Sequence, residues 1–217
     1  MIEAVVSGVA AFAATNLDDL FLLMLWFSRA RADPGAERMI VAGQYLGFSA
    51  LVLLSVLGYV GALLIPREYV GLLGILPIIL GLRELLSLRR RAANEVEPMD
   101  ADDPGGNVPG VLRSRLFRWL DPRAAAVAAV TVANGSDNLA VYPPLFAAGD
   151  VTRMVVIILV LLVMVGVWCL LADRFAEHPV TAAPLRKYGP AVMPFVLIGI
   201  GLLILVESGA VRLLGLQ

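Results

Sequence analysis

The sequence contains very little cysteine or histidine: one residue of each, Cys169 and His178, in a chain of 217. A lone cysteine excludes an internal disulfide framework and a thiol redox pair, and the two residues together are too few for a Cys/His zinc cluster. An excess of positive charge is also missing, because the formal net charge is −1, and no nucleic-acid partner is expected. The sequence has no Gly-x-x-x-x-Gly-Lys loop, so ATP is not expected to be a direct energy source.

Hydrophobic residues, in contrast, are abundant. They make up 59% of the chain, whereas soluble domains have about 45–50%. They form runs long enough to cross a bilayer, and backbone groups in lipid must be satisfied within helices. The sequence therefore predicts an all-α integral membrane protein with six transmembrane helices, over residues 2–27, 39–65, 69–88, 124–147, 154–172 and 188–211.

The basic residues predict the orientation of these helices. Fourteen of the 17 Lys and Arg residues lie in the first, third and fifth loops, and only Arg67, Arg153 and Arg212 lie elsewhere. Because basic loops stay on the cytoplasmic side, both termini are expected outside. The first basic residue is Arg29, so the segment before it lacks the charged start of a signal peptide and is interpreted as a retained first span.

The two halves of the chain are related in pattern. Thr15-x-x-Asp18-Asp19-Leu20 in the first half corresponds to Asn134-x-x-Asp137-Asn138-Leu139 in the second. Because each half has three spans, the second half enters the membrane in the opposite direction, as in the inverted repeats of secondary transporters. We therefore predict a three-helix repeat at 1–88, a cytoplasmic linker at 89–121 with acidic residues and a short interfacial helix at 111–120, and a second repeat at 122–217.

Three carboxylates lie inside apolar segments: Asp18 and Asp19 in the first span and Asp137 in the fourth. A carboxylate at the centre of a membrane helix costs about 2.5–3.5 kcal/mol, and those that are retained usually mark an ion or substrate path. The alternative is a structural role, in which protons or arginines neutralise them. The spans contain no arginine near these residues, which favours the functional interpretation.

Helical spacing groups further oxygen-bearing side chains with these acids. Thr15 shares a helical face with Asp18 and Asp19. In the same way, Asn134 shares a face with Asp137 and Asn138. Carboxylate and carbonyl oxygens are ligands for divalent cations. A weak helical stretch at Gly135-Ser136 would release backbone carbonyls as further ligands if it unwound. Gln44, within Gly43-x-x-x-Gly47, is either an auxiliary ligand or a contact between helices.

At these residues the sequence resembles the cadmium-resistance transporter family (CadD-type) of the LysE-type exporter superfamily. The segment Val-Ala-Ala-Phe-Ala-Ala-Thr-Asn-Leu-Asp-Asp-Leu-Phe-Leu-Leu-Met-Leu, from Val9 to Leu25, resembles the first span of that family. The segment Ala-Asn-Gly-Ser-Asp-Asn-Leu-Ala-Val-Tyr-Pro-Pro-Leu-Phe-Ala, from Ala133 to Ala147, resembles the fourth. The resemblance implies export of cadmium or a similar cation across the inner (cytoplasmic) membrane of a bacterium. It also implies an ion-binding set of Asn16, Asp18, Asp19, Asn134, Asp137 and Asn138, to which Thr15, Gln44 and Ser136 are added as secondary candidates.

The interpretation is therefore a secondary transporter, not an enzyme, that exports a divalent cation through a midplane site, with proton antiport as a hypothesis. Cadmium is soft and prefers thiolates, whereas these ligands are oxygens, so zinc, manganese or calcium remain alternatives. An exporter of organic cations or basic amino acids would use the same carboxylates. A thiol-disulfide carrier would need two cysteines and is rejected, and a hydrolase would need a water-accessible aspartate pair. The lipid bilayer and the metal substrate are the expected partners. No resident cofactor or catalytic residue is predicted. The Gly43/Gly47 pair would pack helices either within one subunit or between two, so a homodimer is an alternative to a monomer.

Overall fold

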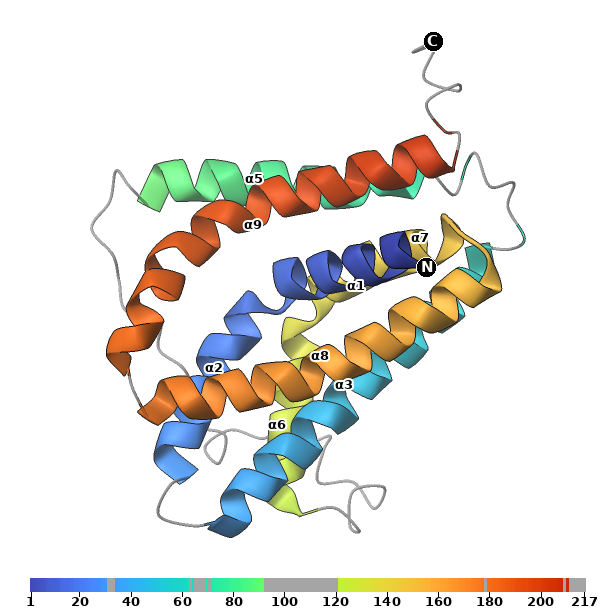
Figure 1. Cartoon of the computed structure of the whole chain (residues 1–217). Helices are drawn as coiled ribbons and strands as arrows, with labels where there is room; N and C mark the ends of the chain where they lie inside the picture. Colours follow the sequence, from blue (N-terminus) through green and yellow to red (C-terminus); the bar gives the residue numbers. More distant parts are fainter. Residues whose placement is uncertain are drawn as a thin grey trace.

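The computed structural model describes residues 1–30, 34–62, 64, 69, 72–91, 121–177, 179–208 and 210, and only the backbone of 34, 88–91, 136 and 179–190. The described residues form helices and the turns between them, without a strand (Figure 1). The all-helical prediction is confirmed for this part of the chain. The acidic part of the linker and the interfacial helix expected at 111–120 lie outside the described residues.

Among the described residues, helices lie in each of the segments expected to span the membrane. In chain order they are α1 (Ile2–Thr15), α2 (Leu17–Ala30), α3 (Pro34–Ala62), the short 3-10 helix η1 (Leu72–Gly74), α5 (Ile75–Arg91), α6 (Pro122–Asn134), α7 (Ser136–Ala147), α8 (Val151–Glu177) and α9 (Pro179–Glu207). The helices extend beyond the apolar runs: α3 begins five residues before the expected 39, because Pro34 and Glu37 suit a first helical turn.

Two of the expected spans are broken helices. The first bends by 63° between α1 and α2, and the fourth is interrupted between α6 and α7. Each break is a single residue, Asn16 in the first span and Gly135 in the fourth, and both residue types are weak helix formers. The two breaks occupy the same position of the repeated motif, one residue after Thr15 and one after Asn134.

The two halves of the chain are intertwined. α1 and α2 pack along α8 of the second half, while α6 and α7 pack along α3 of the first half. α5 and α9 lie against each other and close one side of the bundle, where they contact α1 and α7 (Figure 1). Figure 1 places the start of α1 and the end of α9 at one end of the molecule, and the ends of α2, α5 and α8 at the other.

Glycines allow the closest helix contacts. A Cβ atom on Gly43 would lie 2.5 Å from the Ala124 carbonyl oxygen, and one on Gly47 would lie 2.7 Å from the Ala128 carbonyl oxygen. Both glycines therefore let α3 approach α6 within the same chain. This use of the Gly43-x-x-x-Gly47 pair is within one chain, and a homodimer stays a prediction.

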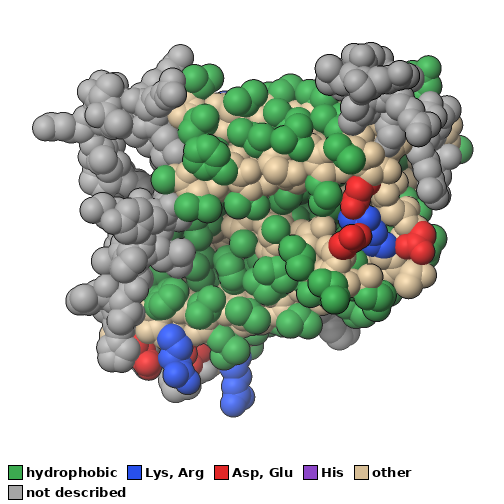
Figure 2. Space-filling view, turned by 45° about the horizontal axis from the view of Figure 1, so that its top comes forward, with side chains coloured by type: hydrophobic (Ala, Val, Ile, Leu, Met, Phe, Trp, Pro, Cys, Tyr) green, Lys and Arg blue, Asp and Glu red, His purple; other side chains and the backbone are tan. Residues whose placement is uncertain are grey.

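The helices are apolar enough for a membrane. Among the described residues, α3 and α8 each have the length and hydropathy of a membrane span, and the bent pair α1 and α2 makes a third if it counts as one. On the face shown in Figure 2, hydrophobic side chains are spread over the described surface, and the charged side chains gather in two places, at the lower left and on the right. The six-span arrangement goes beyond this finding and stays a prediction.

The substitution Gly43→Ala tests the contact between α3 and α6. We expect it to lower the free energy of unfolding by about 1–3 kcal/mol, because the added methyl group overpacks a backbone contact. The measurement is thermal or denaturant unfolding of the purified protein in detergent. Gly61→Ala is the matched control on the same helix, since nothing lies within 4 Å of its Cβ position. Equal stability of the two variants would contradict the packing described.

Candidate polar site at the two helix breaks

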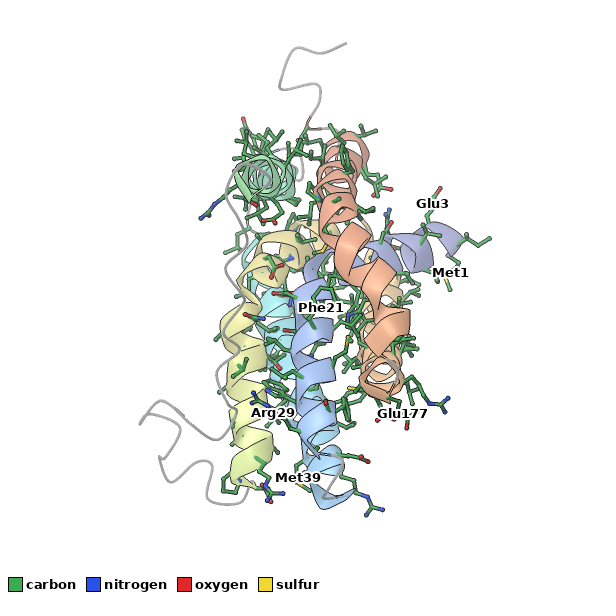
Figure 3. All side chains as sticks on the ribbon, turned by 90° about the vertical axis from the view of Figure 1, so that its left-hand side faces the viewer. Met1, Glu3, Phe21, Arg29, Met39 and Glu177 are labelled. Atoms are coloured by element: carbon green, nitrogen blue, oxygen red, sulfur yellow. The ribbon has the colours of Figure 1, made fainter. Side chains whose placement is uncertain are left out.

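Buried polarity concentrates at the two helix breaks. Six of the eight buried polar residues of the described core lie there: Thr15, Asn16, Asp19, Gln44, Thr131 and Asn138. Figure 3 shows side-chain nitrogen and oxygen atoms in the interior between α2 and α6, near the labelled Phe21. Arg29 lies farther along, toward the end of α2 (Figure 3).

One part of the site is acidic. The Asn134 side chain donates from Nδ2 to Asp18 Oδ2 and to Asp19 Oδ1, at 3.2 Å in each case. Gln44 Nε2 donates to the other oxygen of Asp19, Oδ2, at 2.9 Å. A single amide from the second half of the chain thus holds both carboxylates of the first.

The third carboxylate belongs to the same electrostatic environment. Asp137 Oδ1 accepts a hydrogen bond from the Asn138 backbone N–H at 3.0 Å. Its charge repels that of Asp18 and, more weakly, that of Asp19. Glu84 of α5 is half-buried and close enough to Asp18 for their charges to repel each other.

The adjoining part of the site is neutral. Asn16 Nδ2 and Asn138 Oδ1 are 3.3 Å apart, and Asn138 Nδ2 and Asn16 Oδ1 are 3.4 Å apart, which makes a reciprocal amide pair. The fully buried Tyr142 hydroxyl lies 3.0 Å from both Thr15 Oγ1 and Asn16 Nδ2. Trp168 Nε1 donates to the Asn16 carbonyl at 2.7 Å. These contacts hold the two breaks together.

Helix ends supply the electrostatic support for the carboxylates. Asp18 and Asp19 lie in the first turn of α2, and Asp137 lies in the first turn of α7. The N-terminal end of a helix carries partial positive charge and backbone N–H groups without an intrahelical partner, so it stabilises a carboxylate. No ion pair to these three acids occurs within the described part of the chain.

The structure brings most of the predicted residues together in these two networks. Asp18, Asp19, Asn134 and Gln44 are joined directly by hydrogen bonds. Asn16, Asn138 and Thr15 belong to the neutral network, where their side chains form hydrogen bonds with other side chains of the protein. Ser136 begins α7, and its side chain is not among those described.

Two backbone carbonyls at the breaks, those of Gly135 and Asn16, already have hydrogen-bond partners. The Gly135 carbonyl accepts a hydrogen bond from Leu139 N at 3.3 Å, and the Asn16 carbonyl accepts from Leu20 N at 3.2 Å. Among the described residues, no group of three His, Cys, Asp or Glu side chains is arranged to hold a metal ion. A cation at this site therefore needs amide, hydroxyl or water oxygens beside the carboxylates.

Sequence reasoning missed three residues of the site. Tyr142 lies one helical turn after Asn138, and that spacing is the only signal in the sequence that would have indicated it. Thr131 and Trp168 lie on apolar helices outside the repeated motif. Their roles depend on tertiary packing, which one sequence does not reveal.

Buried carboxylates and amides at the breaks of apolar helices are typical of membrane transporters. A family model described as cadmium resistance transporter matches residues 12–105 and 110–216. The chain therefore belongs to the cadmium resistance transporter family. No curated protein and no solved structure matches it. The family is one of transporters rather than enzymes and, with the apolar helices, it indicates a membrane protein involved in metal export.

The substitution Tyr142→Phe tests whether the neutral network stabilises the fold. We expect a loss of about 1–2 kcal/mol, because removing the hydroxyl leaves buried groups of Thr15 and Asn16 without this partner. The measurement is the unfolding midpoint in detergent. Tyr59→Phe on α3 is the control, since Tyr59 is also buried but belongs to neither network. Loss of the same size in both variants would show that the hydroxyl contacts at the breaks have no special weight.

Proposed function

We propose that this protein exports a divalent cation from the cytoplasm and binds it at Asp18, Asp19, Asn134 and Asp137. The observation that carries the proposal is the Asn134 amide, which donates to Asp18 and to Asp19 at 3.2 Å. The amide N–H group lies between two carboxylates, which is where a cation would bind. A divalent cation neutralises both acids more completely, and rotation of the amide would then present its carbonyl oxygen to the ion.

The ligand chemistry bears on which cation is carried. Carboxylate, amide and hydroxyl oxygens suit calcium and manganese, and carboxylates also bind zinc, whereas cadmium favours thiolates. Cadmium nevertheless stays the first candidate because the family is described by resistance to it. A soft ion on oxygen ligands is bound weakly, and weak binding favours release on the far side of the membrane.

We also propose that the six helical segments span the membrane as two inverted repeats. Three observations support this: the breaks at Asn16 and Gly135 occupy equivalent motif positions, each broken helix packs on the middle helix of the other half, and α5 pairs with α9. The arrangement in Figure 1, with the ends of α2, α5 and α8 at one end of the molecule, agrees with an alternating path of the chain. With the basic loops on the cytoplasmic side of a bacterial inner membrane, both termini lie outside.

Coupling to protons is the mechanism we favour. The three carboxylates must be neutralised when the metal leaves, and protons are the simplest replacement for a cation among buried acids. An inward flow of protons would then drive metal outward. The breaks place the acids at the ends of half-helices, where a small rotation of one half changes the side from which the site is reached.

The test is transport in liposomes that contain the purified protein. We expect uptake of cadmium, or of zinc, manganese or calcium, that depends on an imposed proton gradient. Asp19→Asn and Asp137→Asn should reduce it at least tenfold, since each removes charge that no nearby group replaces. Glu3→Gln is the matched control, because Glu3 is exposed at the start of α1.

The variants must keep their unfolding midpoints for the comparison to count. Metal flux that both aspartate variants retain would contradict the proposed site. Metal flux that does not depend on the proton gradient would contradict proton antiport but leave the proposed metal site standing. Absence of metal flux in the wild type, together with transport of an organic cation or a basic amino acid, would contradict metal export and favour the alternative substrate class.

A further inference from the structure

Gln44 and Thr131 form a buried hydrogen-bond chain that ends at Asp19. Both side chains are 2% exposed. Gln44 Nε2 donates to Asp19 Oδ2 at 2.9 Å, and the Thr131 hydroxyl lies 2.7 Å from Gln44 Oε1. The same hydroxyl lies 3.0 Å from the Val127 carbonyl oxygen.

Thr131 has one hydroxyl proton and two acceptors within reach. If the proton goes to Gln44 Oε1, the amide is held with its N–H groups toward Asp19. If the proton goes to the Val127 carbonyl, the threonine oxygen is free to accept, and a reversed Gln44 amide can donate to it. Thr131 is therefore able to satisfy either orientation of Gln44.

We propose that Gln44 and Thr131 act as a relay in which the Gln44 amide reverses when a cation binds Asp19. Without the cation, Gln44 donates an N–H to the carboxylate. With the cation, Gln44 Oε1 becomes a ligand, Nε2 donates to Thr131, and Thr131 donates to Val127. The inference rests on the proposed function and adds Thr131, a positioning residue that does not touch the ion.

The physical reason is the cost of an unpaired buried polar group. An N–H directed at a bound cation is repelled by it, so the amide must turn or the ion loses affinity. The turn would normally leave the far end of the glutamine without a partner, which is unfavourable in a buried site. A hydroxyl that both donates and accepts removes this penalty in each state.

The test measures cation affinity of the purified protein by calorimetry, with cadmium as the probe and zinc, manganese and calcium in parallel. We expect Thr131→Val to weaken binding several-fold, because it leaves a buried Gln44 N–H unpaired in the bound state, which costs more than the Gln44 oxygen it leaves unpaired in the cation-free state. Thr131→Ser should restore the affinity, because it keeps the hydroxyl. In a Gln44→Met background, Thr131→Val should have almost no further effect, because the chain has already lost its middle member.

The outcomes separate the relay from the transport site. Absence of binding in the wild type, or binding that Asp19→Asn leaves unchanged, overturns the proposed function and with it the relay. Binding that depends on Asp19 but not on Thr131 overturns the relay alone. Equal losses from Thr131→Val in both backgrounds would show a packing effect, and so would failure of serine to rescue. Unfolding midpoints of all variants verify that the folded protein is compared.

Discussion

Three carboxylates inside an apolar helical protein, without a basic partner among the described residues, set the constraint from which the rest of the structure follows. Asp18, Asp19 and Asp137 are stabilised instead by the N-terminal ends of α2 and α7 and by the amides of Asn134 and Gln44. Such ends exist inside the protein only because the first and fourth helical segments are broken. The breaks at Asn16 and Gly135 are therefore a requirement of the buried charge.

The same constraint joins the two halves of the chain. Asn134 reaches across to the acids of the first half, and the reciprocal pair of Asn16 and Asn138 joins the two breaks directly. The close approach of α3 to α6, which Gly43 and Gly47 allow, brings Gln44 and Thr131 within hydrogen-bond distance. A site made from both halves would change whenever one half moves against the other, which suits the transport mechanism proposed above.

The sequence alone predicted the helical class, the membrane character and the family, because apolar runs and isolated intramembrane acids are strong signals. It also indicated the weak helix at Gly135. It did not indicate that the chain would bend by 63° at Asn16, nor that Trp168 of α8 would donate a hydrogen bond to the Asn16 carbonyl there. The roles of Thr131 and Tyr142 were not predicted because their hydroxyl groups bond to residues of other helices, and the sequence does not show which helices lie side by side.

For the candidate ligands too, the sequence predicted which residues group along one helix but not which groups meet in the folded protein. Motif spacing grouped Asp18 with Asp19 and Asn134 with Asp137, and helical geometry suffices for that. Spacing did not separate the acidic network from the neutral one. The family resemblance implied Asn16 and Asn138 as ligands, and in the structure their amides bond to each other, so their role as ligands stays a prediction.

The most direct test of the central claim is a crystal structure of the protein soaked with cadmium, in which anomalous scattering locates the ion. The account predicts one strong peak between Asp18, Asp19 and Asn134, with Asp137 beside it and the Gln44 oxygen turned toward the metal. A peak only at Cys169 or on the surface, with Asn134 still bonded to both aspartates, would contradict it.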